Sequence, residues 1–169
     1  MMLRSIVFFV FAVISALSGP LFAACPFCTP SVIENQSVYE NEQFVVLVDI
    51  APVMSGHLLV VPKRHMMKAH EMTEKEWTAL SDVIPKVVKV FQSVYNTDQY
   101  LIIEKNGPFA GQTVPHVHFH CLPMVSQKIA AEAKATLFAK LFNQMPSRLS
   151  KEDVHAEAVR LRTHFEAMK

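Results

Sequence analysis

The sequence predicts one α+β domain, in which an antiparallel sheet is covered by a long helix and followed by a helical C-terminal extension. Three observations predict this class: short β-branched runs that recur between residues 44 and 122, one amphipathic stretch among them, and a helix-type composition after Pro123. The chain has 169 residues, which is enough for one domain with a substantial core. The sequence contains no internal repeat and no low-complexity segment.

The composition narrows the class of protein. Apolar residues make up 51% of the chain and charged residues 18%, which excludes a disordered tail protein. The formal net charge of +1 argues against a dedicated nucleic-acid binder, because such a protein carries a basic face. We therefore expect no nucleic-acid partner.

The chain begins with an apolar segment that is typical of a leader. Of the first 24 residues 18 are apolar, and Arg4 is the one charged side chain among them. A positive start, the apolar run 6–17 and the small residue Ala23 predict a signal peptide over 1–23, cleaved after Ala23. The run is shorter than the roughly 18–20 residues that span a bilayer, so a retained membrane anchor is the second choice. We expect an exported or membrane-anchored protein, with a cytoplasmic one as the alternative.

Four strands are predicted in the body of the chain. Residues 44–50 and 57–62 are β-branched runs joined by a short loop with a proline and a glycine, so they should pair as antiparallel neighbours. Residues 100–104 form a third run, and residues 114–122 a fourth, with the turn-rich segment 106–111 between them. These runs make the sheet.

The long helix begins at a capping box. The Thr73 hydroxyl and the Glu76 carboxylate can each accept a backbone N–H of the first turn. Apolar residues then recur at helical spacing as far as Tyr95, and Pro85 should kink the helix locally. The members of this stripe are Trp77, Leu80, Ile84, Val87, Val88, Phe91 and Val94.

The C-terminal extension should also be helical. Residues 129–142 are rich in Ala, Leu and Phe, and a second helix should begin at Ser150. Its apolar side would carry Val154, Ala158, Leu161 and Phe165. The predicted organisation is therefore a leader over 1–23, a domain over 24–125 and a helical extension over 126–169 that packs on the domain.

Three histidines alternate with apolar residues near the end of the domain. In a strand, His116, His118 and His120 would share one face about 6.6 Å apart, while the residues between them point to the core. A purely structural strand has little reason to carry three titratable rings on one face. Two chemistries would use such a row: a zinc hydrolase with histidine ligands, or a neutral imidazole that attacks an electrophilic phosphorus. The second also uses Gln112 and Thr113 as donors to phosphate oxygens.

Four motifs carry a resemblance to a known family. The segment GQTVPHVHFHCL at 111–122 resembles the signature of the histidine triad (HIT) superfamily, His-φ-His-φ-His-φ-φ with φ apolar. The pair Asp49-Ile50 and the segment GHLLVVPKRH at 56–65 are similar to the first strand pair of the family, and CPFC at 25–28 to a motif that opens many bacterial members. The resemblance covers about residues 25–124 and implies a HIT-like fold.

The resemblance also implies an activity. The protein would be a nucleotide hydrolase or transferase that cleaves at the α-phosphorus of nucleoside phosphoramidates or dinucleoside polyphosphates, through a nucleotidyl-histidine intermediate. His118 would be the nucleophile, His120 would contact the phosphate or steady the nucleophile, and His57 would help from the neighbouring strand. The substrate would be a purine nucleotide, no catalytic metal is required, and a homodimer is expected.

The nucleotide-binding residues follow from the same resemblance. Asp49 would accept hydrogen bonds from the ribose hydroxyls, and Ile50 would pack on the base. Asn106, Gln112 and Thr113 would contact ribose or phosphate. A short acceptor at a strand end and donors on a glycine-bounded turn suit a sugar diol and an anion.

Cys25 and Cys28 form a Cys-x-x-Cys pair, which by itself is a zinc half-site or a redox dithiol. The resemblance implies a structural zinc completed by His65 and His116. Two alternatives stay open: an exported thiol oxidoreductase, and a zinc- or nucleotide-binding module without turnover. The cysteine pair follows the leader almost directly instead of opening a helix after a strand, which argues against redox catalysis.

Overall fold

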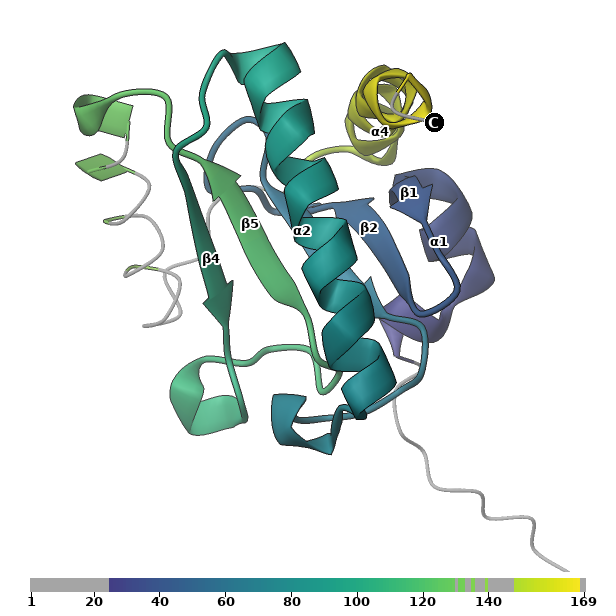
Figure 1. The fold of residues 1–169 in the computed structure, drawn as a ribbon. Coiled ribbons are helices and arrows are strands. Elements are labelled where there is room, and N and C mark those ends of the chain that lie inside the picture. Colours follow the sequence, from purple (N-terminus) through teal and green to yellow (C-terminus); the bar gives the residue numbers. More distant parts are fainter. Residues whose placement is uncertain (1–24, 130, 133–134, 136–138, 140–147, 168–169) are drawn as a thin grey trace, which may run out of the picture.

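Five strands form one antiparallel sheet with the order β1-β2-β3-β5-β4 (Figure 1). The computed structural model describes residues 25–129, 131–132, 135, 139 and 148–167. The strands are β1 (Ser37–Glu40), β2 (Phe44–Val48), β3 (Leu58–Pro62), β4 (Tyr100–Glu104) and β5 (Phe119–Pro123). The helices are α1 (Pro30–Gln36), α2 (Glu74–Tyr95) and α4 (Lys151–Glu166), with short 3₁₀ turns at Pro26–Cys28, Ala69–Glu71 and Pro108–Ala110. The predicted α+β class is confirmed.

The sheet has a different cover on each face. On one face α2 lies across the strands, and with α4 it closes the main core (Figure 1). On the other face Val45, Leu47, Leu59 and Val61 form a smaller apolar cluster under Phe27 and Ile33, which belong to the N-terminal turn and α1. Side chains of a β-strand alternate between the two faces of the sheet. The polar residues of the candidate functional site lie on this second face.

The predicted start of the fourth strand is wrong. The strand β5 begins at Phe119, not at residue 114. The preceding residues form a turn instead, in which the His116 N–H donates to the Val114 carbonyl and the Val117 N–H to the Met66 carbonyl. Val117, Phe119 and Cys121 are buried in the main core, as the alternation predicted. Of the three histidines, only His120 therefore lies on a regular strand.

Two elements were not predicted, namely α1 and β1. Each is short, and β1 mixes one buried residue with partly exposed ones, so neither shows a clear period in the sequence. The predicted strands 44–50 and 57–62 are confirmed as β2 and β3, which pair along their whole length.

The helix α2 begins with the predicted capping box at Thr73 and Glu76 and continues past Pro85 to Tyr95. Trp77 is an exception to its apolar stripe, because 44% of the residue is exposed. Val83 and Val90, which were not in the predicted stripe, are fully buried. The helix thus turns a slightly different side to the sheet than the spacing indicated.

The helix α4 confirms the predicted C-terminal element. Ser150 caps it by accepting the Asp153 N–H, and its four predicted apolar residues are buried in the main core. Most of the predicted helix 129–142 and the whole leader 1–23 lie outside the described residues. In the part of the chain that the structure describes, no helix has the length and apolar character needed to cross a membrane.

Candidate functional site

A cavity of about 190 Å³ opens on the second face of the sheet, next to α1. Five of the predicted site residues line it, contributed by the end of β2, the loop before β5 and β5 itself: Asp49, Ile50, Thr113, His118 and His120. The chain therefore brings these residues together from segments about 70 positions apart.

Behind the cavity, a hydrogen bond links His57 and His120, and Asp49 lies beside His57. The His57 Nδ1 accepts the Val53 N–H at 3.2 Å and lies 3.2 Å from the Asp49 Oδ2, so the His57 Nε2 donates to the His120 Nδ1, which is 2.9 Å away. Gly56 makes this position possible. It adopts a φ of +82°, and a Cβ there would lie 2.7 Å from the Tyr95 ring, so glycine is required just before His57.

His118 is held in one tautomer. Its Nδ1 lies 2.7 Å from the His116 carbonyl oxygen, which can only accept, so the proton is on Nδ1 and Nε2 carries the lone pair. Burial lowers the pKa of His118. The ring is therefore neutral at pH 7, which is the state that a nucleophilic imidazole requires.

His120 is also neutral. Burial is the main cause that lowers its pKa, and the neighbouring His57 acts in the same direction. Its ring centroid lies 4.8 Å from that of His118. The His120 Nε2 is buried and has no hydrogen-bond partner among the described residues. A buried polar atom of this kind, beside a neutral histidine and at the wall of a cavity, is suited to a polar ligand.

Asn106 and Gln112 lie outside the cavity lining. The Asn106 Oδ1 accepts the Ala69 N–H at 2.7 Å, and its amide nitrogen donates to Glu104. The Gln112 Oε1 accepts the Gly107 N–H at 2.6 Å, and its Nε2 donates to the Met67 carbonyl at 2.9 Å. In this structure both amides hold the loop before β5, and their contacts with a nucleotide stay predictions.

The cavity also contains side chains that the sequence reasoning missed. Phe27, Gln36 and Arg148 line it, and Arg148 comes from the segment before α4. The Leu149 N–H donates to the Ile50 carbonyl at 2.8 Å, which fixes this segment beside the cavity. No local pattern could have signalled Arg148, because only the packing of α4 brings it there.

Cys25, Cys28, His65 and His116 form a separate cluster beside the cavity. Their potential ligand atoms all lie within 4.8 Å of one another. The Cys25 Sγ lies 3.3 Å from the His116 Nδ1, and the Cys28 Sγ lies 3.4 Å from the His65 Nδ1. Two thiolates and two imidazoles around a tetrahedral zinc would be about 3.5 Å apart, so the four side chains fit this ion.

The orientation of the His116 ring agrees with a metal site. The His116 Nε2 donates to the Pro62 carbonyl at 2.8 Å, which directs the unprotonated Nδ1 at the thiols. Burial lowers the pKa of His116 to about 4. Burial, with Cys25 nearby, raises the pKa of Cys28 to about 11.

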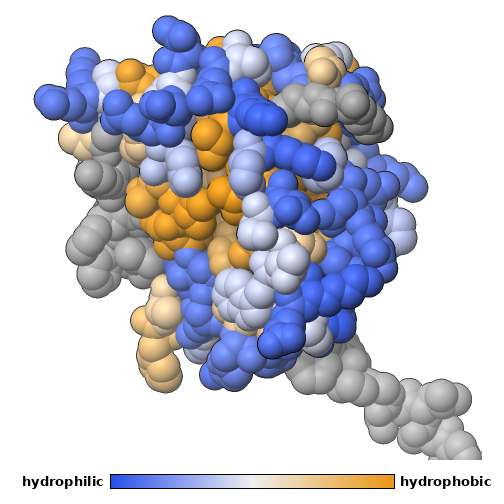
Figure 2. Space-filling model, in the orientation of Figure 1, coloured by the Kyte–Doolittle hydropathy of each residue, from blue (hydrophilic) through white to orange (hydrophobic). Residues whose placement is uncertain are grey.

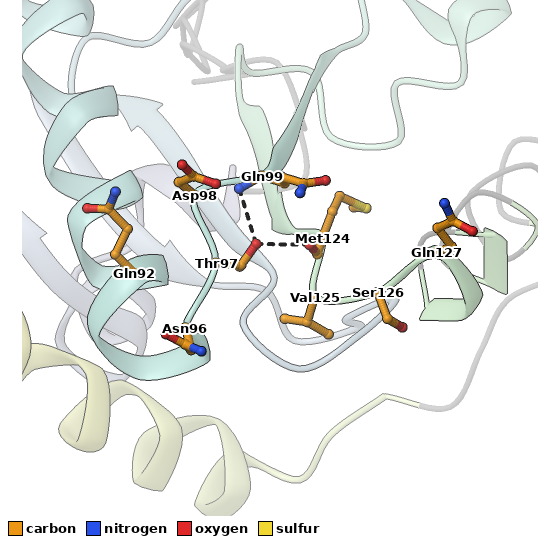
Figure 3. A pocket seen from close by; sticks show the side chains of 9 residues that line it. All are labelled: Gln92, Asn96, Thr97, Asp98, Gln99, Met124, Val125, Ser126 and Gln127. Atoms are coloured by element: carbon orange, nitrogen blue, oxygen red, sulfur yellow. Dashed lines mark hydrogen bonds between the residues drawn. The ribbon is translucent and has the colours of Figure 1, made fainter.

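A second cavity, of about 570 Å³, lies at the C-terminal end of α2 (Figure 3). Its wall is held by Thr97, whose Oγ1 donates to the Met124 carbonyl at 3.0 Å and accepts the Gln99 N–H at 3.1 Å. The described lining residues include one carboxylate, Asp98, and no histidine or cysteine. The chemistry therefore points to the smaller, histidine-lined cavity.

An antiparallel sheet with α2 on one face and buried histidines on the other defines an α+β protein of the histidine triad class. Residues 31–127 match the family model of the HIT domain, and the chain belongs to the HIT family. The expectation from the four sequence motifs is thereby confirmed.

Several known proteins are similar to this chain. The adenosine 5′-monophosphoramidase of Saccharomyces cerevisiae is 34% identical over 133 residues, which cover 74% of this chain and 82% of that protein. The bis(5′-adenosyl)-triphosphatase of Dictyostelium discoideum is 30% identical over 136 residues, with 80% and 89% covered. A protein of Sulfolobus tokodaii described as a hypothetical histidine triad nucleotide-binding protein superposes with a TM-score of 0.64 at 25% identity, over 86% of this chain and 94% of that one.

Proposed function

We propose that this HIT protein hydrolyses or transfers nucleotides at the α-phosphorus of nucleoside phosphoramidates or dinucleoside polyphosphates. The observation that carries the proposal is the neutral His118, whose Nε2 lone pair is left for attack because Nδ1 donates to the His116 carbonyl. The relatives named as a phosphoramidase and a triphosphatase support the same substrate class.

The reaction has two steps. In the first, the His118 Nε2 forms a bond to the α-phosphorus, and the bond from phosphorus to the leaving nitrogen or oxygen breaks, with its electron pair going to the leaving group. In the second, water attacks the phosphorus, the bond to Nε2 breaks with its electron pair returning to the ring, and the nucleoside monophosphate is released. The proton that the water loses replaces the one that the leaving group took up. His120 would donate from Nε2 to a phosphoryl oxygen or to the leaving group, and His57 would hold the His120 ring by donating from Nε2 to the His120 Nδ1.

Nucleotide binding would use the rest of the cavity. Asp49, at the end of β2, would accept the ribose hydroxyls, Ile50 would pack against a purine base, and Thr113 would donate to phosphate. Asp49 already accepts the Ala51 N–H at 2.8 Å through Oδ1. Its second oxygen, Oδ2, lies beside His57 and would also accept a hydrogen bond from a ribose hydroxyl.

The cluster of Cys25, Cys28, His65 and His116 would hold a structural zinc. Its four ligands leave no open position for water, so the ion would supply rigidity and no chemistry. By fixing His116, the cluster would fix the carbonyl oxygen that sets the tautomer of His118.

A homodimer through β4 is part of the proposal. In the described part of the chain, β4 pairs only with β5 and is an edge of the sheet. Apolar side chains gather over it in the space-filling view (Figure 2). Three residues of β4, Leu101, Ile102 and Ile103, are partly exposed. A sheet edge that is unpaired among the described residues favours pairing with a second chain. A molar mass of one chain in light scattering would contradict the dimer.

Export through the leader 1–23 is likewise proposed, because its pattern is that of a signal peptide. Cell fractionation followed by N-terminal sequencing tests it. A mature chain that begins at Ala24 outside the cytoplasm is expected, and a cytoplasmic chain that keeps Met1 would contradict it.

The function is tested by offering adenosine 5′-phosphoramidate and diadenosine triphosphate to the protein and measuring AMP release. A covalent adenylyl group on His118, found by mass spectrometry after rapid acid quench, is expected during turnover. Binding of AMP without release from either substrate would favour the non-catalytic binding module.

A further inference from the structure

The histidine-lined cavity adjoins a neighbouring cavity of about 430 Å³, which lies between α1 and the start of α4. Four residues line both cavities and so mark their junction: Val32, Gln36, Ile50 and Arg148. Most small-molecule sites have volumes of roughly 300–1,000 Å³. The histidine-lined cavity alone is smaller than such a site, whereas the two cavities together fall within that range.

Gln36 is a buried polar side chain at this junction. It ends α1, and only 9% of the residue is exposed. Its amide has no hydrogen-bond partner among the described residues, whereas the amide of Asn35, one position earlier, donates to the Lys151 carbonyl at 3.4 Å. Buried amides are as a rule hydrogen-bonded in folded proteins, so an unpartnered one in the wall of a cavity is suited to a polar ligand.

The proposed reaction places the base of the nucleotide at the same junction. Asp49 and His118 line only the histidine-lined cavity. With the α-phosphorus at His118 and the ribose at Asp49, the base is the next part of the nucleotide and reaches Ile50. The apolar side chains of Ile50 and Val32 suit the flat faces of a base. The amide of Gln36 is left for its polar edge.

We propose that the Gln36 side chain binds the edge of an adenine base and sets the base preference of the site. This inference rests on the proposed function and deepens it, because it names the base of the nucleotide. A glutamine amide offers an acceptor and a donor side by side, and adenine presents the complementary N6 donor and N7 acceptor. Guanine presents two acceptors at those positions, so the amide could satisfy only one of them.

Isothermal titration of AMP and of purine riboside 5′-monophosphate tests the contact, because the second nucleotide lacks only the 6-amino group. The wild type should bind AMP about fivefold or more tightly than this analogue. Gln36→Met replaces the amide with an apolar end of similar length, so the Kd of AMP should rise about tenfold and the Kd values of the two nucleotides should become equal within about twofold. Gln92→Met, which changes an exposed glutamine on α2, is the matched control and should keep the wild-type ratio.

A Gln36→Met variant that loses affinity for both nucleotides by the same factor would overturn the inference, because a purely structural role predicts a common loss. Gln36→Leu repeats the comparison if the methionine variant does not fold. Wild-type protein that binds the two nucleotides equally well would overturn this inference alone. Wild-type protein that binds neither nucleotide and releases no AMP from either substrate would overturn the proposed function as well.

Discussion

His116 and His118 are two residues apart, but their rings belong to two different regions. The His116 ring lies with Cys25, Cys28 and His65 in a closed cluster, whereas the His118 ring lines the open cavity with His120. Both rings are buried and neutral, yet one has two thiols near its free nitrogen and the other has a free lone pair beside a cavity. The partners of a histidine, and not its burial, separate a metal ligand from a candidate nucleophile.

The two regions are also connected. The His116 carbonyl accepts from the His118 Nδ1, and the Phe27 ring contacts both imidazoles, with centroid distances of 5.8 Å to His116 and 5.2 Å to His118. If the regions have separate roles, changes in one should alter activity and changes in the other should alter stability. The connections limit how complete that separation can be.

The largest effect should come from His118→Asn. The variant keeps a polar side chain of similar size but has no nucleophilic ring nitrogen, so turnover should fall roughly 10⁴-fold or more. Steady-state hydrolysis of adenosine 5′-phosphoramidate measures the loss. Zinc content and the urea unfolding midpoint should match those of the wild type, and activity above a few per cent would contradict the assignment of the nucleophile.

Cys28→Ser should weaken the cluster that contains His116. A serine hydroxyl is a poor zinc ligand, so the zinc per chain should fall well below one and the free energy of unfolding should drop by several kcal/mol. That loss would be part of the roughly 10–16 kcal/mol that structural zinc contributes in zinc-finger peptides. Elemental analysis and urea unfolding provide the two measurements.

Cys121→Ala is the control for that prediction, because Cys121 is buried in the main core and lies outside the cluster. It should keep its zinc. Full zinc content in the Cys28 variant would show that the cluster is not the metal site.

Glu76→Gln removes the charge that pairs with Arg64, in the loop that carries His65. It tests how much this loop contributes to stability. The Glu76 carboxylate accepts from Arg64 at 2.8 Å and caps α2, and these contacts lower its pKa from 4.5 to about 2. The pair therefore stabilises the fold above pH 4.5, and that stability is lost as the pH falls through about 2. At pH 7 the variant should be about 2 kcal/mol less stable, a value reduced by solvent screening of the half-exposed Arg64.

The pH dependence of unfolding checks this expectation. Wild type and Glu76→Gln should differ at pH 7 and converge toward pH 2. Glu42→Gln, which removes an exposed ion pair with Lys75, should cause little change at either pH. A constant difference between wild type and the Glu76 variant across this range would contradict the linkage.

The smallest effect should come from Phe27→Ala, which tests the connection between the regions. Phe27 is partly exposed, so the loss of stability should be about 1–2 kcal/mol, below the cost for a fully buried phenylalanine. The KM should rise about three- to tenfold because the ring lines the cavity. An effect on stability alone would place Phe27 with the cluster and not with the cavity.

Much of the architecture could be predicted from local sequence. The capping box at Thr73 starts α2, and the buried strands β2 and β3 appear as β-branched runs of the right length. The strand that was predicted to begin at residue 114 was wrong because the pattern of alternating histidines continues through a turn. Alternation reports which face a residue points to, and it does not report whether the backbone makes ladder hydrogen bonds.

The sequence by itself determined the family, the sheet-and-helix class and the residues able to do chemistry, because these depend on periodicity and on side-chain type. Only the tertiary structure decided the environment of each residue. It separated His116 from His118, directed the amides of Asn106 and Gln112 to contacts within the loop region, and brought Arg148 to the histidine-lined cavity. These outcomes depend on strand register and on the docking of α4, which join residues distant in the chain and leave no local pattern.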